Sequence, residues 1–277
     1  MGFIEVFEKK VKNTVKNFNL IKKNEKLIVA CSGGKDSTTA LYLLYKFGYN
    51  VEALFIDVGI PDSSNKNLIN LRAFCNEHNI KLNIAVLKEE IGDSLVELHK
   101  KIKNMSPCAV CGVIKRHYLT LKARELGADK LVTGHNLDDE AENILLNVFG
   151  GNLSISLGLS PISGTIKNKK FIPRIKPLYY CTNSETRKYT EMKGFNVLYC
   201  NCPLSAFVFR RRIRAIIQEL EKNEKKIKLN IVNNFLKLLP SLRKKHAEGL
   251  KINYCAECGE PSRNEICKKC ELVKKNK

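Results

Sequence analysis

Cysteines in CxxC pairs occur at two places in this 277-residue chain, and their spacing suggests metal or redox chemistry. The C-terminal segment CAECGEPSRNEICKKC contains two such pairs, Cys255 with Cys258 and Cys267 with Cys270. Four thiolates at this spacing close a tetrahedral Zn²⁺ shell. Because polar and charged residues fill the gap between the pairs, metal binding would supply the folding energy of this segment. We therefore predict a structural zinc site here, with an unstructured tail carrying incidental cysteines as the alternative.

The other pair, Cys108 and Cys111, lies in SPCAVCGVIKRHYL and has no neighbouring pair to complete a set of four. The later candidates Cys181, Cys200 and Cys202 are far away in the sequence. A thioredoxin-like redox pair, a zinc site with a further ligand, and an iron–sulfur cluster held by three cysteines all fit this pattern. A three-cysteine cluster would leave one iron open to an exogenous sulfur atom or a substrate. The residues alone leave these alternatives open.

The segment SGGKDS joins an apolar strand to a helix and has the composition of a phosphate-binding turn. Glycines let the backbone approach a ligand, and the helix start offers N–H groups to an anion. Lys35 adds a cation, and Asp36 is expected to bind Mg²⁺, which often bridges phosphates. The spacing matches neither GxxxxGK[ST] nor GxGxxG, and an ordinary strand–turn–helix junction is the alternative. The predicted phosphate site comprises Ser32, Gly33, Gly34, Lys35, Asp36 and Ser37.

A second polar cluster, TGHNLDDEAEN, follows a later apolar strand. Gly134 is expected to let the backbone approach a nucleotide. Asp138 and Asp139 fall in the first turn of the next helix, where carboxylates also stabilise the helix dipole. Adjacent carboxylates at the carboxyl edge of a parallel sheet lie where such sheets bind ligands. We predict a Mg²⁺ or acid–base site at this position.

The hydrophobic pattern predicts the strands and helices that would position these segments. Apolar runs at 27–30, 50–57, 81–87, 130–135 and 195–203 alternate with helical patterns. Continuous apolar strands that alternate with helices are typical of α/β proteins, so we predict a doubly wound parallel sheet. The cysteine-rich C-terminal segment is predicted to form a small separate module.

The charge of the chain indicates a polyanionic partner. There are 48 Lys and Arg residues against 28 Asp and Glu, a formal net charge of +20, which is typical of nucleic-acid binding. A proteome rich in lysine is the alternative explanation. Arg210, Arg211, Arg212 and Arg214 cluster at a helix start and are predicted to contact RNA, although a solvated charged face has the same pattern.

The sequence also bears on location. The first 18 residues lack the apolar core of a signal peptide, and no apolar run is long enough to cross a membrane. The chain has 11 cysteines, several of them in CxxC pairs, which in a cytoplasmic protein indicates metal binding or catalysis rather than a disulfide framework. We therefore expect a cytoplasmic protein with no membrane partner.

Several motifs together resemble a known family. SGGKDS after an apolar strand resembles the PP-loop of the N-type ATP pyrophosphatases, which holds the pyrophosphate portion of ATP while a substrate is adenylated. CAVCGVIKRHYL, CNCPLSAFVFRRRIR, GHNLDDEAE and IPRIKPLYY resemble segments of the tRNA 2-thiolation enzymes, the TtcA/TtuA family and its wobble-uridine relatives. The C-terminal cysteine quartet is similar to that of the TtuA and wobble-uridine branches.

The resemblance assigns roles to particular residues. It implies a [4Fe-4S] cluster held by Cys108, Cys111 and Cys202, with Cys202 preferred to Cys200 because Pro203 follows it as in the family motif.

The nucleotide site is implied in the same way. The resemblance places Lys115 near the ATP phosphates, Asp139 in catalysis, and Ile56 and Gly134 beside the nucleotide.

The implied reaction is ATP-dependent. The 2-oxygen of a tRNA uridine, in the T-loop or at the wobble position, is adenylated with Mg·ATP, pyrophosphate leaves, and sulfur then displaces AMP. The implied partners are tRNA, a sulfur donor (sulfide or a thiocarboxylated ubiquitin-like protein) and a second copy of the chain. Two alternatives remain: another PP-loop ligase of amidating or lysidine type, and a non-enzymatic zinc-stabilised RNA-binding or redox-sensing protein.

The predicted organisation has four parts. They are an N-terminal amphipathic helix at 1–24, a PP-loop ATPase domain with the iron–sulfur site at 25–225, a helical linker at 226–253 and a zinc ribbon-like module at 254–277.

Overall fold

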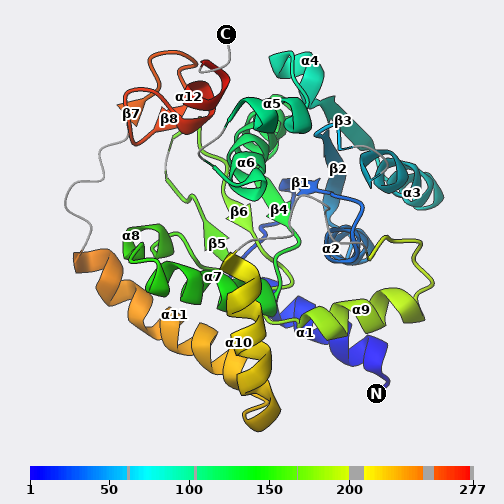
Figure 1. The fold of residues 1–277 in the computed structure, drawn as a ribbon. Coiled ribbons are helices and arrows are strands. Elements are labelled where there is room, and N and C mark those ends of the chain that lie inside the picture. Colours follow the sequence, from blue (N-terminus) through cyan, green and yellow to red (C-terminus); the bar gives the residue numbers. More distant parts are fainter. Residues whose placement is uncertain (61–62, 103–104, 167, 200–208, 246–252, 275–277) are drawn as a thin grey trace.

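Strands in the order β3-β2-β1-β4-β6-β5 form the central sheet of the computed structural model (Figure 1). The structure describes residues 1–60, 63–102, 105–166, 168–199, 209–245 and 253–274. Neighbouring strands pair in parallel from β3 through to β6, and β5 pairs antiparallel with β6. The strands are β1 Lys26–Ala30, β2 Asn50–Asp57, β3 Leu82–Val86, β4 Lys130–Thr133, β5 Ile162–Ser163 and β6 Arg174–Ile175.

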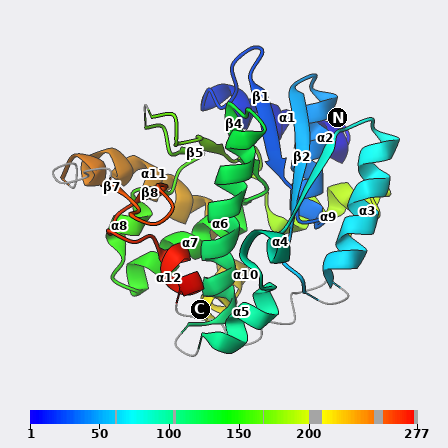
Figure 2. The ribbon, with the colours of Figure 1, turned by 90° about the horizontal axis from the view of Figure 1, so that it is seen from above.

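Helices cover both faces of this sheet, as predicted for a doubly wound α/β fold. Side chains alternate along a strand, so Leu27 and Val29 of β1 enter one core while Ile28 enters the other. The first core includes α1, α2, α3 and α9, and the second includes α4, α5 and α6 (Figures 1 and 2). Their bounds are α1 Phe3–Asn17, α2 Lys35–Lys46, α3 Ser63–Glu77, α4 Leu87–Ile91, α5 Leu95–Lys101, α6 Pro107–Glu125 and α9 Asn183–Met192.

A third core lies among the helices that follow β4 and those late in the chain. Leu137 of α7 (Leu137–Phe149) packs with Ile213 of α10 (Phe209–Asn223) and Phe235 of α11 (Ile227–Lys245). The short helix α8 (Leu153–Ser156) follows α7. The segment predicted as a helical linker thus contains α11, whose apolar side is buried against α7 and α10.

The C-terminal module contains the antiparallel pair β7 (Asn253–Tyr254) and β8 (Pro261–Ser262), followed by α12 (Lys268–Lys274). Figure 2 shows α12 beside α6, and Leu272 of α12 is buried in the core that α6 shares with the sheet. Arg124 of α6 holds the module through a bidentate ion pair with Glu260, at 2.5 and 2.9 Å. The module is therefore docked on the same helix that begins with the CxxC pair.

The strand predicted at 195–203 is wrong for its described part. Residues 195–199 make a single parallel bridge, between Leu198 and Gly34, and β6 takes the place beside β4. Phe195 instead packs its ring against Tyr42 and Phe74, at centroid distances of 5.0 and 5.1 Å. Apolar residues in this segment are buried against helices and not as part of the sheet. A short apolar run in the sequence does not distinguish these two kinds of burial.

No helix in the described ranges is both long and apolar enough to cross a membrane.

Candidate active site

The turn between β1 and α2 has the geometry of an anion site. Gly33 has φ +77°, and a Cβ there would lie 2.7 Å from the Cβ of Asn67, so this position requires glycine. Gly34 is the N-cap of α2, which leaves the first N–H groups of the helix without helical partners. The Ser37 hydroxyl accepts a hydrogen bond from the Ser32 N–H at 3.2 Å and donates to the Gly34 carbonyl at 3.0 Å. The predicted SGGKDS segment therefore forms a braced turn at a helix N-terminus.

A cavity of about 440 Å³ opens in front of this turn. Its volume is that of a small-molecule site. Segments far apart in the sequence form its walls, namely the β1–α2 turn, the end of β2 and the first half of α6. Of the predicted site residues, it is lined by Ser32, Gly34, Ile56, Cys108, Cys111 and Lys115.

The first turns of α6 bring the CxxC pair and Lys115 to this cavity. Ser106 caps the helix by accepting a hydrogen bond from the Ala109 N–H at 3.3 Å, and Pro107 stands at its first position. Cys108, Cys111 and Lys115 follow at spacings of three and four, so they share one face of the helix. All three residues belong to one segment of the sequence, and the helix brings their side chains to the same cavity.

The loop after β4 closes against the phosphate turn. A Cβ on Gly134 would lie 2.7 Å from the Ser37 N and 2.8 Å from the carbonyl carbon of Asp36. The close approach at Gly134 is therefore to the backbone of the PP-loop. Asn136, which sequence reasoning did not select, donates from its side-chain amide to Asp36 Oδ1 at 3.1 Å. An Asn directly before a helix is a common N-cap, which was the available signal.

Asp139 lies in the first turn of α7, as predicted, and closes a capping box with Asn136. Its Oδ1 also accepts a hydrogen bond from Arg210 Nη2 at 2.9 Å. Desolvation raises the pKa of Asp139 above its ordinary value, against the lowering effects of Arg210 and Lys35. Lys35 itself contacts Asp36, with Nζ 2.6 Å from Oδ2. Two carboxylates and two cations thus meet beside the phosphate turn.

The neighbouring acidic residues have structural partners. Asp138 forms an ion pair with Lys228 at 2.7 Å and accepts a hydrogen bond from the Asn183 N–H at 2.8 Å. Glu140 is fully buried and makes a bidentate ion pair with Lys176, both contacts being 2.8 Å. Asp139 differs from Asp138 in its partners, because it contacts Arg210 and Asn136, and Asn136 also contacts Asp36 of the phosphate turn.

The arginine cluster at the start of α10 divides into two pairs. Arg210 and Arg214 both donate to Glu142, at 2.6 Å from each Nε, so they face α7. Arg211 and Arg212 are exposed to solvent. Two of the four arginines predicted to bind RNA therefore contact acidic residues of α7, a role that the sequence pattern did not reveal.

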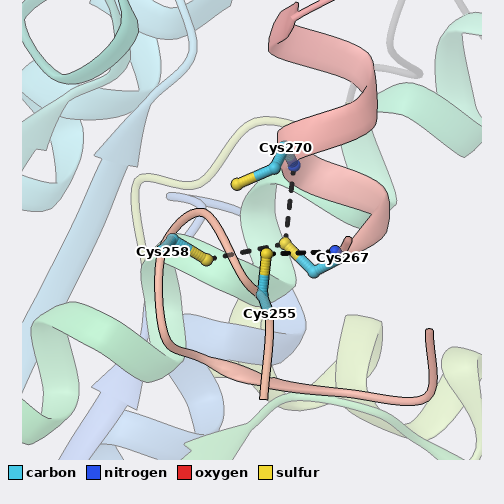
Figure 3. A group of neighbouring side chains, drawn as sticks. All are labelled: Cys255, Cys258, Cys267 and Cys270. Carbon is cyan, nitrogen blue, oxygen red and sulfur yellow. Dashed lines mark hydrogen bonds between the residues drawn. The ribbon is translucent and has the colours of Figure 1, made fainter. Parts of the chain in front are cut away.

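The C-terminal quartet forms a compact set of sulfur atoms (Figure 3). The Sγ atoms of Cys255, Cys258, Cys267 and Cys270 all lie within 4.8 Å of one another. Desolvation of Cys255 opposes its ionisation, but hydrogen bonds from backbone N–H groups, including that of Cys267 at 3.2 Å, outweigh it and lower its pKa to about 6. Four convergent thiols, one of them readily ionised, are a donor set suited to Zn²⁺.

The proposed third cluster ligand is not placed by the structure. Cys200 and Cys202 lie outside the described residues. Leu198, just before them, lines the same cavity as Cys108 and Cys111.

Comparison with known proteins agrees with this geometry. A family model described as a PP-loop domain matches residues 4–220. The chain is 34% identical over 274 residues to the tRNA-5-methyluridine(54) 2-sulfurtransferase of Pyrococcus horikoshii, covering 98% of this chain and 85% of that protein. It is 31% identical over 292 residues to the tRNA 2-thiolation protein NcsA of Haloferax volcanii, covering 98% and 90%.

A solved structure extends the likeness to the fold. The U34-tRNA thiolase NcsA of Methanococcus maripaludis, determined with its [4Fe-4S] cluster, superposes with a TM-score of 0.81. The two sequences are 33% identical, and the match covers 98% of this chain and 87% of that one.

Proposed function

Because this chain belongs to the PP-loop family of tRNA 2-thiolation proteins, we propose that it replaces the 2-oxygen of a tRNA uridine with sulfur in an ATP-dependent reaction. One observation carries the proposal: the CxxC pair and the phosphate turn line one cavity. A sulfur-transferring group and a nucleotide would then lie on either side of the same uridine.

The phosphate turn would hold the pyrophosphate portion of ATP. The N-terminus of α2 presents backbone N–H groups, and Lys35 and Lys115 add positive charge where the leaving pyrophosphate develops negative charge. Ile56 offers an apolar wall for adenine at the end of β2. Asp36 and Asp139 supply the carboxylate oxygens that Mg²⁺ prefers.

Cys108 and Cys111 would hold a [4Fe-4S] cluster together with Cys202. The described pair fits such a group, because both thiols come from one turn of α6 and face a cavity of substrate size. When bound, a cluster with one iron free of protein ligands supplies a place for the incoming sulfur atom. The helix would fix the distance from the two cysteines to Lys115 and the nucleotide phosphates.

Asp139 would act at the adenylation step. Arg210 holds one carboxylate oxygen, and the Asn136 N–H, at 3.3 Å, holds the other, so the group is oriented before substrate binds. Oriented in this way, it would bind Mg²⁺ or stabilise the reacting groups without reorganisation.

The remaining partners follow from the same family assignment. We propose tRNA as substrate, a sulfide or thiocarboxylated ubiquitin-like protein as sulfur donor, a homodimer as the working form and the cytoplasm as location. Zn²⁺ would occupy the C-terminal quartet, where four sulfur atoms converge.

Nucleoside mass spectrometry of tRNA from a strain that lacks this gene tests the proposal. We expect loss of one 2-thiouridine species, and its identity distinguishes T-loop from wobble modification. Complementation should require Cys108. Retention of every 2-thiouridine species would contradict the proposal, and full complementation by a Cys108→Ala variant would instead favour an amidating or lysidine-type ligase.

A further inference from the structure

A second cavity, of about 570 Å³, lies between α6, the segment around β5 and β6, and the C-terminal module. The nucleotide cavity is lined by Cys111 and Lys115 of α6, whereas this one is lined by Val113, Arg116 and Thr120. Within each set the residues are three or four positions apart, so each set lies along one face of the helix. The two sets line different cavities, so their faces differ. The α6 helix therefore separates the two cavities.

Positive charge dominates the lining of the second cavity. Its cationic side chains come from all three surrounding segments, and they are Arg116, Lys170, Arg174, Arg263, Lys268 and Lys269. Among the described lining residues, Glu260 is the one carboxylate, and Arg124 already neutralises it through the bidentate ion pair. Lys268 has its own partner in Glu271, at 2.8 Å. The other cations have no such compensation within the lining.

Arg116 and Arg174 are neighbouring like charges in the lining of this cavity. Arg174 donates to the Arg116 carbonyl at 3.2 Å and to the Thr120 hydroxyl at 2.6 Å, so its guanidinium is fixed by neutral acceptors. Desolvation and then the charge of Arg116 lower the pKa of Arg174. Two guanidinium groups held together without a carboxylate cost folding free energy, and an anion bound between them would offset that cost.

We propose that this second cavity binds phosphodiester groups of the RNA substrate. The inference rests on the proposed function, since it takes tRNA to be the substrate. Guanidinium groups match phosphate oxygens in geometry and charge, and the cations of the lining come from three segments, so they would contact more than one phosphate. Contacts of this kind position an RNA without reading its sequence.

A pair of neutral substitutions tests the site with little structural cost. Arg116 comes from α6 and Arg263 from the C-terminal module, and neither forms an ion pair with a carboxylate in the described part of the chain. The double variant R116Q/R263Q therefore removes two positive charges from the cavity. The matched control K22Q/K23Q removes two exposed charges just before β1, outside the lining of this cavity.

The measurement is the affinity of the holoprotein for tRNA over a range of KCl concentrations. Each lost phosphate contact lowers the slope of log K against log salt by about 0.7–0.9, so the test variant should lose roughly 1–2 units of slope. At moderate salt its affinity should fall by about tenfold or more, while the control stays within about twofold of wild type. The charge-conserving variant R116K/R263K should retain the wild-type slope.

The outcomes separate this inference from the proposed function. If wild type fails to bind tRNA, the proposed function fails. If wild type binds tRNA and R116Q/R263Q matches the control in affinity and slope, the second cavity is not a phosphate site. A loss of slope by R116K/R263K equal to that of R116Q/R263Q would also overturn the assignment, because the charge would be retained.

Discussion

The two cysteine sites of this protein differ in how completely they are enclosed. The C-terminal quartet brings four sulfur atoms within 4.8 Å of one another, and three of these residues are buried. The pair Cys108 and Cys111 is only half-buried and faces a cavity of about 440 Å³ that it shares with the phosphate turn. A closed set of thiolates suits a structural metal, whereas an open pair leaves room for a reacting partner.

The same helix supports both sites. The α6 helix carries the open pair at its N-terminus, and its later residues Tyr118 and Arg124 contact the C-terminal module. Zinc in the quartet would therefore stabilise the module that packs against α6, and α6 in turn would hold the reactive pair beside the nucleotide. Cys108 and Cys111 would thus take part in the reaction, whereas the C-terminal quartet would hold α6 in place.

Loss of the open pair should have the largest effect on activity. We expect Cys108→Ser to lower tRNA thiolation by at least about 100-fold, because it removes a proposed cluster ligand, while ATP binding and thermal stability remain near wild type. Thiolation assays and nucleotide titrations check this. Cys31→Ala is the control, since Cys31 lines the same cavity but is buried, which raises its thiol pKa and keeps it neutral. Equal losses in both variants would contradict a special role for the pair.

Loss of the C-terminal cysteine quartet should affect the folding of the C-terminal module before it affects the chemistry. Cys258→Ser, or removal of zinc with a strong chelator, is expected to unfold the C-terminal module, because metal binding supplies on the order of 10 kcal/mol to such sites. Limited proteolysis with zinc analysis checks this, with cleavage expected after about residue 253. A module that stays protected without zinc would show that its packing on α6 suffices.

The carboxylate of Asp139, beside the phosphate turn, should make activity depend on pH. Arg210 favours the ionised form of Asp139, so Arg210→Gln should raise the pKa of Asp139 further. If catalysis needs the carboxylate, activity is lost as pH falls through that pKa, and the acid limb of the pH profile should move to higher pH. Arg214→Gln is the control, because Arg214 contacts Glu142 and not Asp139. An unchanged acid limb in Arg210→Gln would exclude Asp139 as the titrating group.

The smallest effect concerns the link between the two sites. Arg124→Gln removes a partly buried bidentate ion pair with Glu260 and should lower the free energy of unfolding by about 1 kcal/mol. The exposed ion pair of Arg187 with Glu191 is the comparison. Arg187→Gln should lower the free energy of unfolding by only about 0.3 kcal/mol. Chemical denaturation measures both. Equal values would mean that Arg124 does not anchor the module.

Local patterns in the sequence predicted much of this structure. β2 was predicted with its observed bounds, and α7 was predicted to begin so that Asp139 lies in its first turn, because local patterns specify an element without reference to the rest of the chain. The strand expected at 195–203 was wrong in its described part, since burial by helices and burial in a sheet produce the same apolar pattern.

The site was predicted less completely than the fold. Family resemblance placed Lys115 near the ATP phosphates and assigned the CxxC pair to a cluster, and the structure brings these residues together on one helix face that lines a cavity with the phosphate turn. Partners across the sheet could not be inferred, such as Asn136 with Asp36 or Arg210 with Asp139, because these pairs are far apart in sequence. The role of Gly134 also depends on a contact with the distant phosphate turn.

Metal and labile-sulfide analysis of protein purified without oxygen tests the central comparison most directly. The account predicts about four iron and four sulfide per chain together with about one zinc. Cys108→Ser should lose the iron and keep the zinc, and Cys258→Ser should do the reverse. Zinc at both sites with no iron or labile sulfide in the wild-type protein would contradict the account.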